Sequence, residues 1–322
     1  MTVGSVTAGS SVSELAIETR GLSKRFGHQD AVAELDLSVP RGAVFGFLGP
    51  NGSGKTTTIR MLLGLASATS GSINVLGLAI PDRLHDVLPW VGALVEGPAF
   101  YPFLSGADNL HRLDTADPRA PASTRTARVA RALDRVGLSH ASHKKVRAYS
   151  LGMKQRLGIA NALLVQRELL VLDEPTNGLD PQGTREVRSL VRTLAAEGTT
   201  VFLSTHLLAE VEQICTHAAV MSAGRLVAQG TLDELRSGKA RLMLHTPDVV
   251  SARQVLISLG IEPDMAGDGI VSAALPEYQG EPESIVAALV AAGIRVRGFS
   301  VDSATLEDRF VALTGEGFNV VQ

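Results

Sequence analysis

A glycine-rich segment that ends in one lysine and two threonines is the first feature able to do chemistry. Residues 49–57 read Gly-Pro-Asn-Gly-Ser-Gly-Lys-Thr-Thr, a complete G-x-x-x-x-G-K-[ST] loop between an apolar run and a helical pattern. Glycines let backbone amides approach anionic oxygens, and a helix N-terminus attracts negative charge. The residues expected to bind the phosphates are Gly49, Pro50, Asn51, Gly52, Ser53, Gly54, Lys55, Thr56 and Thr57. The sequence therefore predicts a nucleoside triphosphate site, in which Lys55 reaches the β- and γ-phosphates and Thr56 offers a hydroxyl to Mg²⁺.

A second candidate feature is an apolar run, Leu169–Leu172, that ends in the two acids Asp173 and Glu174. Such a run can be buried in a parallel sheet and deliver both carboxylates at the edge beside the phosphate loop. We expect Asp173 to hold Mg²⁺ through water, as in other P-loop enzymes. Glu174 lies one residue further on and is the candidate general base, or at least a polariser, for the attacking water.

The elements that must position these groups are visible as patterns of apolar residues. Continuous apolar runs separated by helical stretches predict a parallel α/β core with strands at Val44–Leu48, Val91–Val95, Leu169–Asp173, Thr200–Ser204 and Ala218–Ser222. Shorter segments predict an antiparallel subsheet with strands at Leu15–Arg20, Ala31–Val39 and Ser72–Leu76. Between Gly97 and Gly158 the strand signals stop and helical periodicity replaces them, which predicts a helical insertion.

A new unit begins at about Lys239 and reads as a small α/β sandwich without a catalytic constellation. Its expected strands are Arg241–His245, Ile270–Leu275 and Ile294–Ser300, and its expected helices are Val249–Leu259, Glu283–Ala292 and Ala304–Leu313. We therefore expect a disordered tail at 1–14, a nucleotide-binding domain at 15–238 with its insertion at about 97–158, and an accessory domain at 239–322.

The overall composition limits the possible classes of protein. A net charge of −3 and a pI of about 6.3 argue against a strongly basic nucleic-acid surface, so no nucleic-acid partner is expected. The single cysteine, Cys215, excludes an intrachain disulfide and a multi-cysteine metal site. No apolar run approaches the roughly 20 residues that span a bilayer, and no signal peptide is recognisable. We therefore expect a cytoplasmic protein whose membrane contact comes through a partner.

Three further segments resemble the motifs of ATP-binding-cassette (ABC) ATPases. Tyr149–Arg156 is similar to the family's signature motif, Asn177–Asp180 to its D-loop, and Ser204–His206 to its switch histidine. All these landmarks occur in the family's order over about residues 15–237. The resemblance implies a RecA-like parallel core, an antiparallel β subdomain, a helical subdomain, and ATP with Mg²⁺ as ligands.

The resemblance also implies roles for individual residues. Phe26 would stack on adenine, His206 would contact the γ-phosphate and orient the attacking water, and Asp180 would belong to the D-loop. Ser150 and Gly152 would lie at a helix N-terminus and offer a hydroxyl and amides to ATP held by the opposite subunit. Two cassettes, identical or different, would then enclose two nucleotides head to tail.

Three positions depart from the family's usual pattern. Leu151 replaces a glycine of the family's signature, and Met153 replaces a glutamine. The contacts that the glutamine side chain makes in the family are therefore not expected in this chain. Glu96 stands where the family normally has a glutamine that touches Mg²⁺ and the transmembrane partner. It keeps an oxygen ligand but adds negative charge, as in cassettes that handle bacitracin and lantibiotics. The expected metal-binding residues are thus Thr56, Asp173 and Glu96.

The loop Gly97–Leu104 holds three aromatic residues and two prolines in a chain with only 4% aromatic residues. In the family this region forms a groove for a helix of the membrane subunit, and exposed aromatic residues suit such an interface. The C-terminal stretch Leu306–Gly315 resembles the extension of daunorubicin, bacitracin and sodium-efflux cassettes. The chain is therefore expected to be the ATPase subunit of an exporter with a separate permease. A soluble cassette of the translation or DNA-repair type and a nucleotide sensor without turnover are the alternatives.

Overall fold

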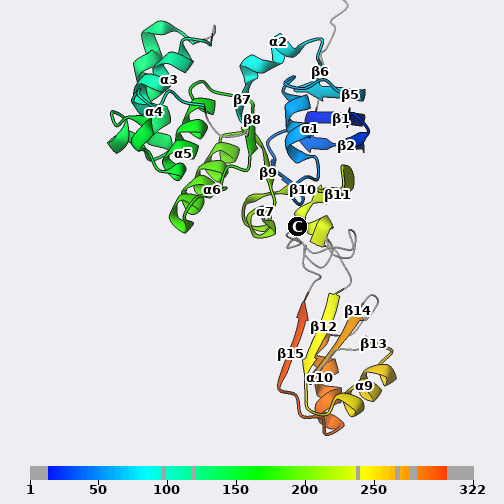
Figure 1. Cartoon of the computed structure of the whole chain (residues 1–322). Coiled ribbons are helices and arrows are strands. Elements are labelled where there is room, and N and C mark those ends of the chain that lie inside the picture. The colour runs from blue at the N-terminus through cyan, green and yellow to red at the C-terminus, as the bar shows by residue number, and fades with distance from the viewer. Residues whose placement is uncertain are drawn as a thin grey trace, which may run out of the picture. The chain divides into compact units, whose positions relative to one another are not determined.

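The computed structural model describes residues 14–95, 99–117, 120–236, 240–264, 269–275 and 281–302. The chain divides into two compact units, and the division falls between Thr231 and Leu232. The first unit contains two sheets and a group of helices, and the described residues of the second form a small sheet and three helices (Figure 1).

The central sheet of the first unit positions the nucleotide motifs. Its strands, in spatial order, are β11 (Arg225–Thr231), β10 (His217–Ser222), β4 (Val44–Leu48), β9 (Thr200–Thr205), β8 (Leu169–Asp173) and β7 (Val91–Leu94). The five strands from β10 to β7 are parallel, as predicted, and β11 is antiparallel to β10. Strands β4, β8 and β9 are buried along their whole lengths, which explains their continuous apolar runs. Their carboxyl ends lie at one edge of the sheet, where the predicted site residues begin.

The second sheet is antiparallel, as predicted, although its strand boundaries differ from the prediction. Its strands are β2 (Gln29–Leu35), β1 (Leu15–Phe26), β5 (Ser70–Val75) and β6 (Leu78–Ile80), with β3 (Ser38–Pro40) also paired to β1. The single strand expected at Ala31–Val39 is wrong, because β2 ends at Leu35 and β3 begins only at Ser38. The Thr19 hydroxyl bridges this break by donating to Leu35 O and accepting from Leu37 N.

The helices of the first unit fall into two groups. Helices α1, α2, α6 and α7 pack with the sheets, and α3, α4 and α5 gather to one side (Figure 1). Their bounds are α1 (Lys55–Leu62), α2 (Leu84–Val87), α3 (Gly106–Asp114), α4 (Arg125–Arg135), α5 (Leu151–Ala162), α6 (Pro181–Ala196) and α7 (Leu208–Ile214). Asp114 of α3 accepts hydrogen bonds from Arg125 and Arg128 of α4, and these ion pairs join the two helices. The group formed by α3, α4 and α5 spans Gly106 to Ala162.

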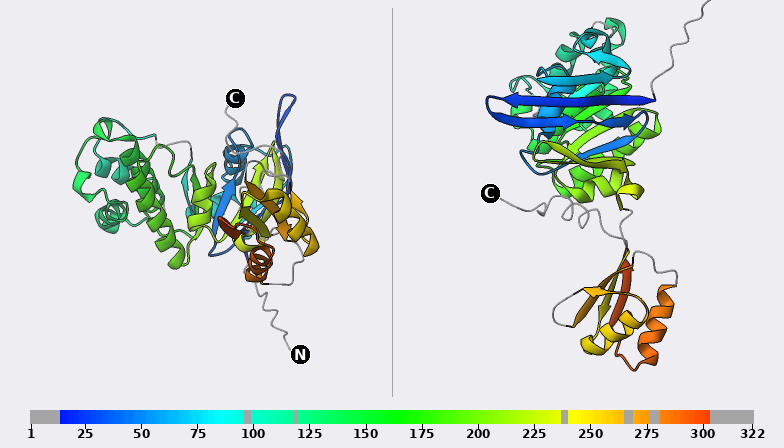
Figure 2. Two further views of the ribbon diagram at one scale, coloured as in Figure 1. Left: turned by 90° about the horizontal axis from the view of Figure 1, so that it is seen from below. Right: turned by 90° about the vertical axis from the view of Figure 1, so that its right-hand side faces the viewer.

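The second unit begins with α8 (Leu232–Arg236) and builds one antiparallel sheet. Its further elements are β12 (Ala240–His245), α9 (Val249–Ser258), β13 (Pro263–Asp264), β14 (Ile270–Leu275), α10 (Pro282–Ala291) and β15 (Gly298–Asp302). The strand order β13-β14-β12-β15 and the β-α-β-β-α-β succession are those of a ferredoxin-like split βαβ unit. Helices α9 and α10 lie on one face of the sheet (Figure 2). Leu242 and Leu244 of the sheet form a core with Leu256 and Leu289 of the helices.

One expected strand of this unit is displaced along the chain. The prediction placed it at Ile294–Ser300, whereas β15 covers Gly298–Asp302. Ile294 instead closes the end of α10: its amide donates to Leu289 O, Gly293 has a φ of 79°, and its side chain enters the core. This is the hydrophobic closure of a helix C-terminus. The helix expected at Ala304–Leu313 and the stretch Leu306–Gly315 lie outside the described residues.

Candidate nucleotide-binding and hydrolysis site

The phosphate loop lies between β4 and α1 and is shaped by glycines. Gly54 has a φ of 102° and immediately precedes α1, and a Cβ at this position would lie 2.5 Å from the carbonyl oxygen of Ala31. Only glycine fits such a place without strain. Lys55 folds back over the loop, where its Nζ donates to Gly49 O at 2.7 Å and to Pro50 O at 3.1 Å. Its ammonium group thus lies at the centre of the loop.

Burial lowers the pKa of Lys55 from its ordinary value, while the carboxylates of Glu174 and Asp173 act in the opposite direction. The Lys55 Nζ lies 3.8 Å from Glu174 Oε1. An anion placed in the loop would favour the charged form of this lysine, because an opposite charge nearby stabilises the ammonium. The loop is therefore arranged to receive an anionic ligand.

Asp173 and Thr56 come together from β8 and α1. The Thr56 hydroxyl donates to Asp173 Oδ2 at 3.0 Å, and the other oxygen of Asp173 accepts from the Ser204 hydroxyl of β9. A hydroxyl and a carboxylate side by side are oxygen donors of the kind that Mg²⁺ prefers. Among the described residues, no group of three or more His, Cys, Asp or Glu side chains could hold a metal ion. A cation here would therefore need further ligands from water or phosphate oxygens.

Glu174 is held in an unusual backbone conformation at the end of β8. Its φ is 47°, in the left-handed region that non-glycine residues adopt rarely and at a cost in free energy. Its amide donates to both the carbonyl and the hydroxyl oxygen of Ser204, and its carboxylate Oε2 lies 2.9 Å from His206 Nδ1. The structure thus brings Lys55, Glu174 and His206 together beside the phosphate loop.

These groups line one cavity of about 540 Å³, a volume suited to a nucleotide. The predicted residues in its lining are Phe26, Asn51, Gly52, Gly54, Lys55, Thr56, Thr57, Glu174 and His206. The Phe26 ring is 54% exposed and has the Lys24 ammonium 4.8 Å from its centroid. An exposed ring at the mouth of such a cavity can stack on a planar base.

Some lining residues were missed from the sequence. They are Gln29, Asp30, Ala31, Asn177, Ala223 and Gly224. The first three begin β2, just after the turn that follows Phe26, and their closeness to that residue was the only available signal. The hairpin between β10 and β11, which contributes Ala223 and Gly224, carries no motif.

The signature residues lie at the start of α5 and are not in the lining of this cavity. Ser150 is the N-cap of α5 and accepts a hydrogen bond from Met153 N at 3.2 Å. Asp180 caps α6 in the same way, by accepting from Gly183 N at 2.7 Å. The start of α5 packs against the Asn177–Asp180 segment, since a Cβ on Gly178 would lie 2.5 Å from Leu151 Cδ2. Leu151 itself is 62% exposed.

Helix α5 also contacts Glu174, and this contact was not predicted from the sequence. Gln155 is buried, and its Nε2 donates to the backbone oxygen of Glu174 at 3.2 Å. Gln155 belongs to the segment that resembles the signature motif, but no role was predicted for it. Glu96, by contrast, lies outside the described residues.

Comparisons with known proteins agree with this geometry. The family model described as "ABC transporter" matches residues 32–177, and one described as an AAA domain of a putative AbiEii toxin matches residues 145–212. The bacitracin transport ATP-binding protein BcrA of Bacillus licheniformis is 38% identical over 305 residues, which cover 94% of this chain and 98% of that protein. The daunorubicin/doxorubicin resistance ATP-binding protein DrrA of Streptomyces peucetius is 37% identical, over 93% of this chain and 92% of that protein.

Solved structures show the same fold. The ATP-binding subunit of an ABC transporter is 29% identical with a TM-score of 0.62, over 69% of this chain and 92% of that one. A dimeric ATP-binding cassette bound to ADP and phosphate also has a TM-score of 0.62, at 21% identity, over 67% of this chain and 98% of that one. The phosphate loop, Glu174 and His206 line one cavity, Asp173 is bonded to Thr56 of that loop, and these similarities show the family of the chain. It belongs to the ATP-binding-cassette transporter family, as a subunit that hydrolyses ATP to drive transport.

Proposed function

We propose that this chain powers the export of an antibiotic or a similar compound through a separate permease, at the inner face of the cell membrane. The observation that carries the proposal is the similarity, over more than nine tenths of the chain, to proteins named for bacitracin transport and daunorubicin/doxorubicin resistance. Within the part of the chain that the structure describes, no helix is long and apolar enough to cross a membrane. A separate membrane partner would supply the pathway.

We propose Mg²⁺ as the cation of the site, held by Thr56, Asp173 and Glu96, with Asp173 acting through water. Lys55 would neutralise the β- and γ-phosphates, and the amides of the loop would bind them. Glu174 would accept the proton of the attacking water, and His206 would orient that water and contact the γ-phosphate. The 2.9 Å contact between the Glu174 carboxylate and His206 supports a shared role of these two side chains.

We also propose that ATP joins two cassettes head to tail, as identical or different copies. Ser150, Gly152 and Asp180 would then contribute to a site on the opposite subunit. The support is the place of the signature: Ser150 starts a helix whose amides suit a phosphate, but it does not line the cavity of its own chain.

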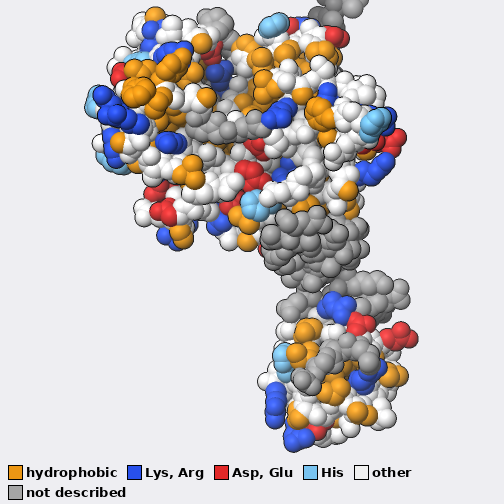
Figure 3. Space-filling model, viewed as in Figure 1, with side chains coloured by type: hydrophobic (Ala, Val, Ile, Leu, Met, Phe, Trp, Pro, Cys, Tyr) orange, Lys and Arg blue, Asp and Glu red, His pale blue; other side chains and the backbone are white. Residues whose placement is uncertain are grey.

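The permease is proposed to dock on the segment around Tyr101 and Phe103. These side chains are 50% and 70% exposed, and the Tyr101 backbone is held by two hydrogen bonds with the Asn109 side chain. Leu65, Leu88 and Trp90 are further exposed apolar residues. Figure 3 shows hydrophobic side chains on both sides of the boundary between the helical group and the sheets. Pro98 and Gly97, also part of the predicted loop, lie outside the described residues.

The docking proposal is tested by the double change Tyr101→Ala and Phe103→Ala. We expect basal ATPase activity to stay largely intact, because neither side chain lines the nucleotide cavity. Co-purification with the permease from membranes should fall strongly, since aromatic anchors at interfaces are often worth about 2 kcal/mol or more each. Val250→Ala, a change of an exposed apolar residue in the second unit, is the matched control. Full co-purification together with unchanged transport would place the docking surface elsewhere.

Gln155→Ala tests whether α5 positions the hydrolytic group. We expect kcat to fall about tenfold while the Kd for ATP is unchanged, because the lost hydrogen bond holds the backbone of Glu174 and not the nucleotide. Kinetics and equilibrium binding measured on the same preparation separate the two effects. Gln182→Ala, which removes an exposed glutamine from α6, is the control. An unchanged kcat in folded Gln155→Ala would remove the positioning role.

A chain that ends near residue 238 tests the independence of the second unit. This unit has its own core, and its described residues do not line the nucleotide cavity. We expect the shortened chain to fold and to bind ATP with about the affinity of the full chain, as measured by calorimetry. Loss of binding by a folded shortened chain would show that the site extends into the second unit.

A further inference from the structure

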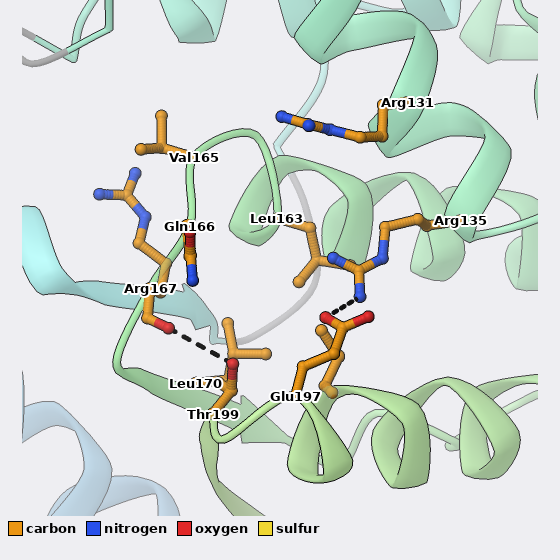
Figure 4. A pocket seen from close by; sticks show the side chains of 10 residues that line it. Arg131, Arg135, Leu163, Val165, Gln166, Arg167, Leu170, Glu197 and Thr199 are labelled. Carbon is orange, nitrogen blue, oxygen red and sulfur yellow. Dashed lines mark hydrogen bonds and ion pairs between the residues drawn. The ribbon is translucent and has the colours of Figure 1, made fainter.

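A second cavity lies at the opposite end of the central strands from the nucleotide. Its volume is about 530 Å³, and it is bounded by α4, by the loop between α5 and β8, and by the end of α6 (Figure 4). Leu170, near the start of β8, and Thr199, just before β9, lie in the wall of this cavity. Asp173 and Glu174 lie at the other end of β8, as its last residue and the one that follows it. The nucleotide site therefore uses none of this space.

Three arginines line this cavity, and their hydrogen-bonding capacity is only partly used. Arg135 pairs with Glu197 across the cavity, as Figure 4 shows. Arg167 pairs with Asp117 at 2.8 Å and also donates to Pro89 O, but its Nε is buried and has no hydrogen-bond partner among the described residues. Arg131 is exposed and makes no hydrogen bond or ion pair within the described ranges. Three guanidinium groups thus face two carboxylates, which leaves a net positive charge.

The C-terminal ends of two helices explain the presence of only part of this positive charge. Helices α5 and α6 end at the cavity, and the carbonyl groups of a helix C-terminus attract cations. That attraction suits Arg135, which pairs with Glu197 at the end of α6. Arg131 donates to none of these carbonyls in the described structure, so its guanidinium remains available to a ligand.

The rest of the lining combines apolar side chains with neutral polar groups. The apolar part comes from Leu163, Val165, Leu170 and Leu194, and the polar part includes the Gln166 amide and the Thr199 hydroxyl. A cavity of this size that offers both apolar and polar side chains can hold a small molecule with both kinds of surface. Guanidinium groups recognise carboxylates and phosphates through paired hydrogen bonds.

We propose that this cavity binds a small molecule in which a phosphate or carboxylate group is joined to an apolar body. The anionic group would pair with the exposed guanidinium of Arg131, and the apolar body would contact the leucines. Arg131 belongs to the helical group and Thr199 to the central sheet, so the ligand would join these two parts. The proposal does not depend on which compound is transported.

Calorimetric titration of the full chain, saturated with ADP and Mg²⁺ to occupy the nucleotide cavity, tests this site. Phenyl phosphate and benzoate are the probes, and the tighter of the two identifies the anionic group. Inorganic phosphate, which lacks an apolar body, is expected to bind about tenfold more weakly than phenyl phosphate. Equal binding of these two phosphates would contradict the apolar part of the proposal.

Substitutions then assign the binding to this cavity. Arg131→Gln should weaken the tighter probe about tenfold, as expected for the loss of one charge-assisted hydrogen bond, and Arg131→Lys should recover part of the loss. Arg253→Gln, a neutralised arginine of α9 in the second unit, should have no effect. Absence of saturable binding, or binding insensitive to Arg131→Gln, would overturn the proposal.

Discussion

Replacing Glu174 with glutamine is expected to lower ATP turnover at least ~100-fold while ATP binding is retained. The glutamine fills the same volume but cannot accept a proton from the attacking water. The carboxylate it replaces is bonded to His206 at 2.9 Å and lies 3.8 Å from the Lys55 ammonium, between the phosphate loop and the histidine. The backbone contacts of residue 174 with Ser204 and Gln155 do not involve the side chain, so its position should be kept.

Steady-state phosphate release and equilibrium ATP binding, measured on the same protein, separate hydrolysis from affinity. Glu168→Gln is the matched control, because Glu168 is exposed, pairs with Arg41 and lies at the other end of β8. It should retain normal turnover. If the Glu174 variant hydrolysed ATP at nearly the normal rate, another group would have to activate the water.

The parallel core could be predicted because burial on both faces of a sheet leaves a plain mark on a sequence. Strands β4 and β8 are continuous apolar runs, and each is followed directly by residues of the phosphate loop or by the acids. Strand order was not needed to place these residues together, since parallel strands that share one direction deliver their carboxyl ends to one edge. The phosphate loop and the two acids therefore followed from local patterns, whereas the roles of Phe26 and His206 came from the family resemblance.

Features that depend on contacts between distant segments could not be predicted. The strand predicted at Leu15–Arg20 in fact continues to Phe26, because its second half pairs with β2. Gly21, inside this longer strand, has a φ of 54°. The link from Gln155 to Glu174 joins residues on different elements and requires the left-handed backbone of Glu174. Nothing local in the sequence encodes either of these long-range contacts.

The second large effect concerns assembly of two cassettes. In the Glu174→Gln background, ATP should shift the chain from monomer to dimer in sedimentation experiments, because a ligand bound only across the interface stabilises the assembled form. Adding Ser150→Arg should abolish this shift at the same protein concentration. The long side chain would keep the α5 amides away from the partner's phosphate, and the hydroxyl that caps α5 would be lost.

Two properties of the Ser150→Arg variant must be separated from assembly. Loss of the N-cap should cost about 1 kcal/mol of stability, so unchanged circular dichroism is required before the sedimentation result is interpreted. An added positive charge alters association through long-range attraction, and Ser258→Arg at the exposed end of α9 in the second unit controls for this effect. ATP binding to the monomer should persist, because Ser150 does not line its own cavity. Equal dimerisation with and without Ser150→Arg would mean that the signature of one chain does not contact the nucleotide of the other.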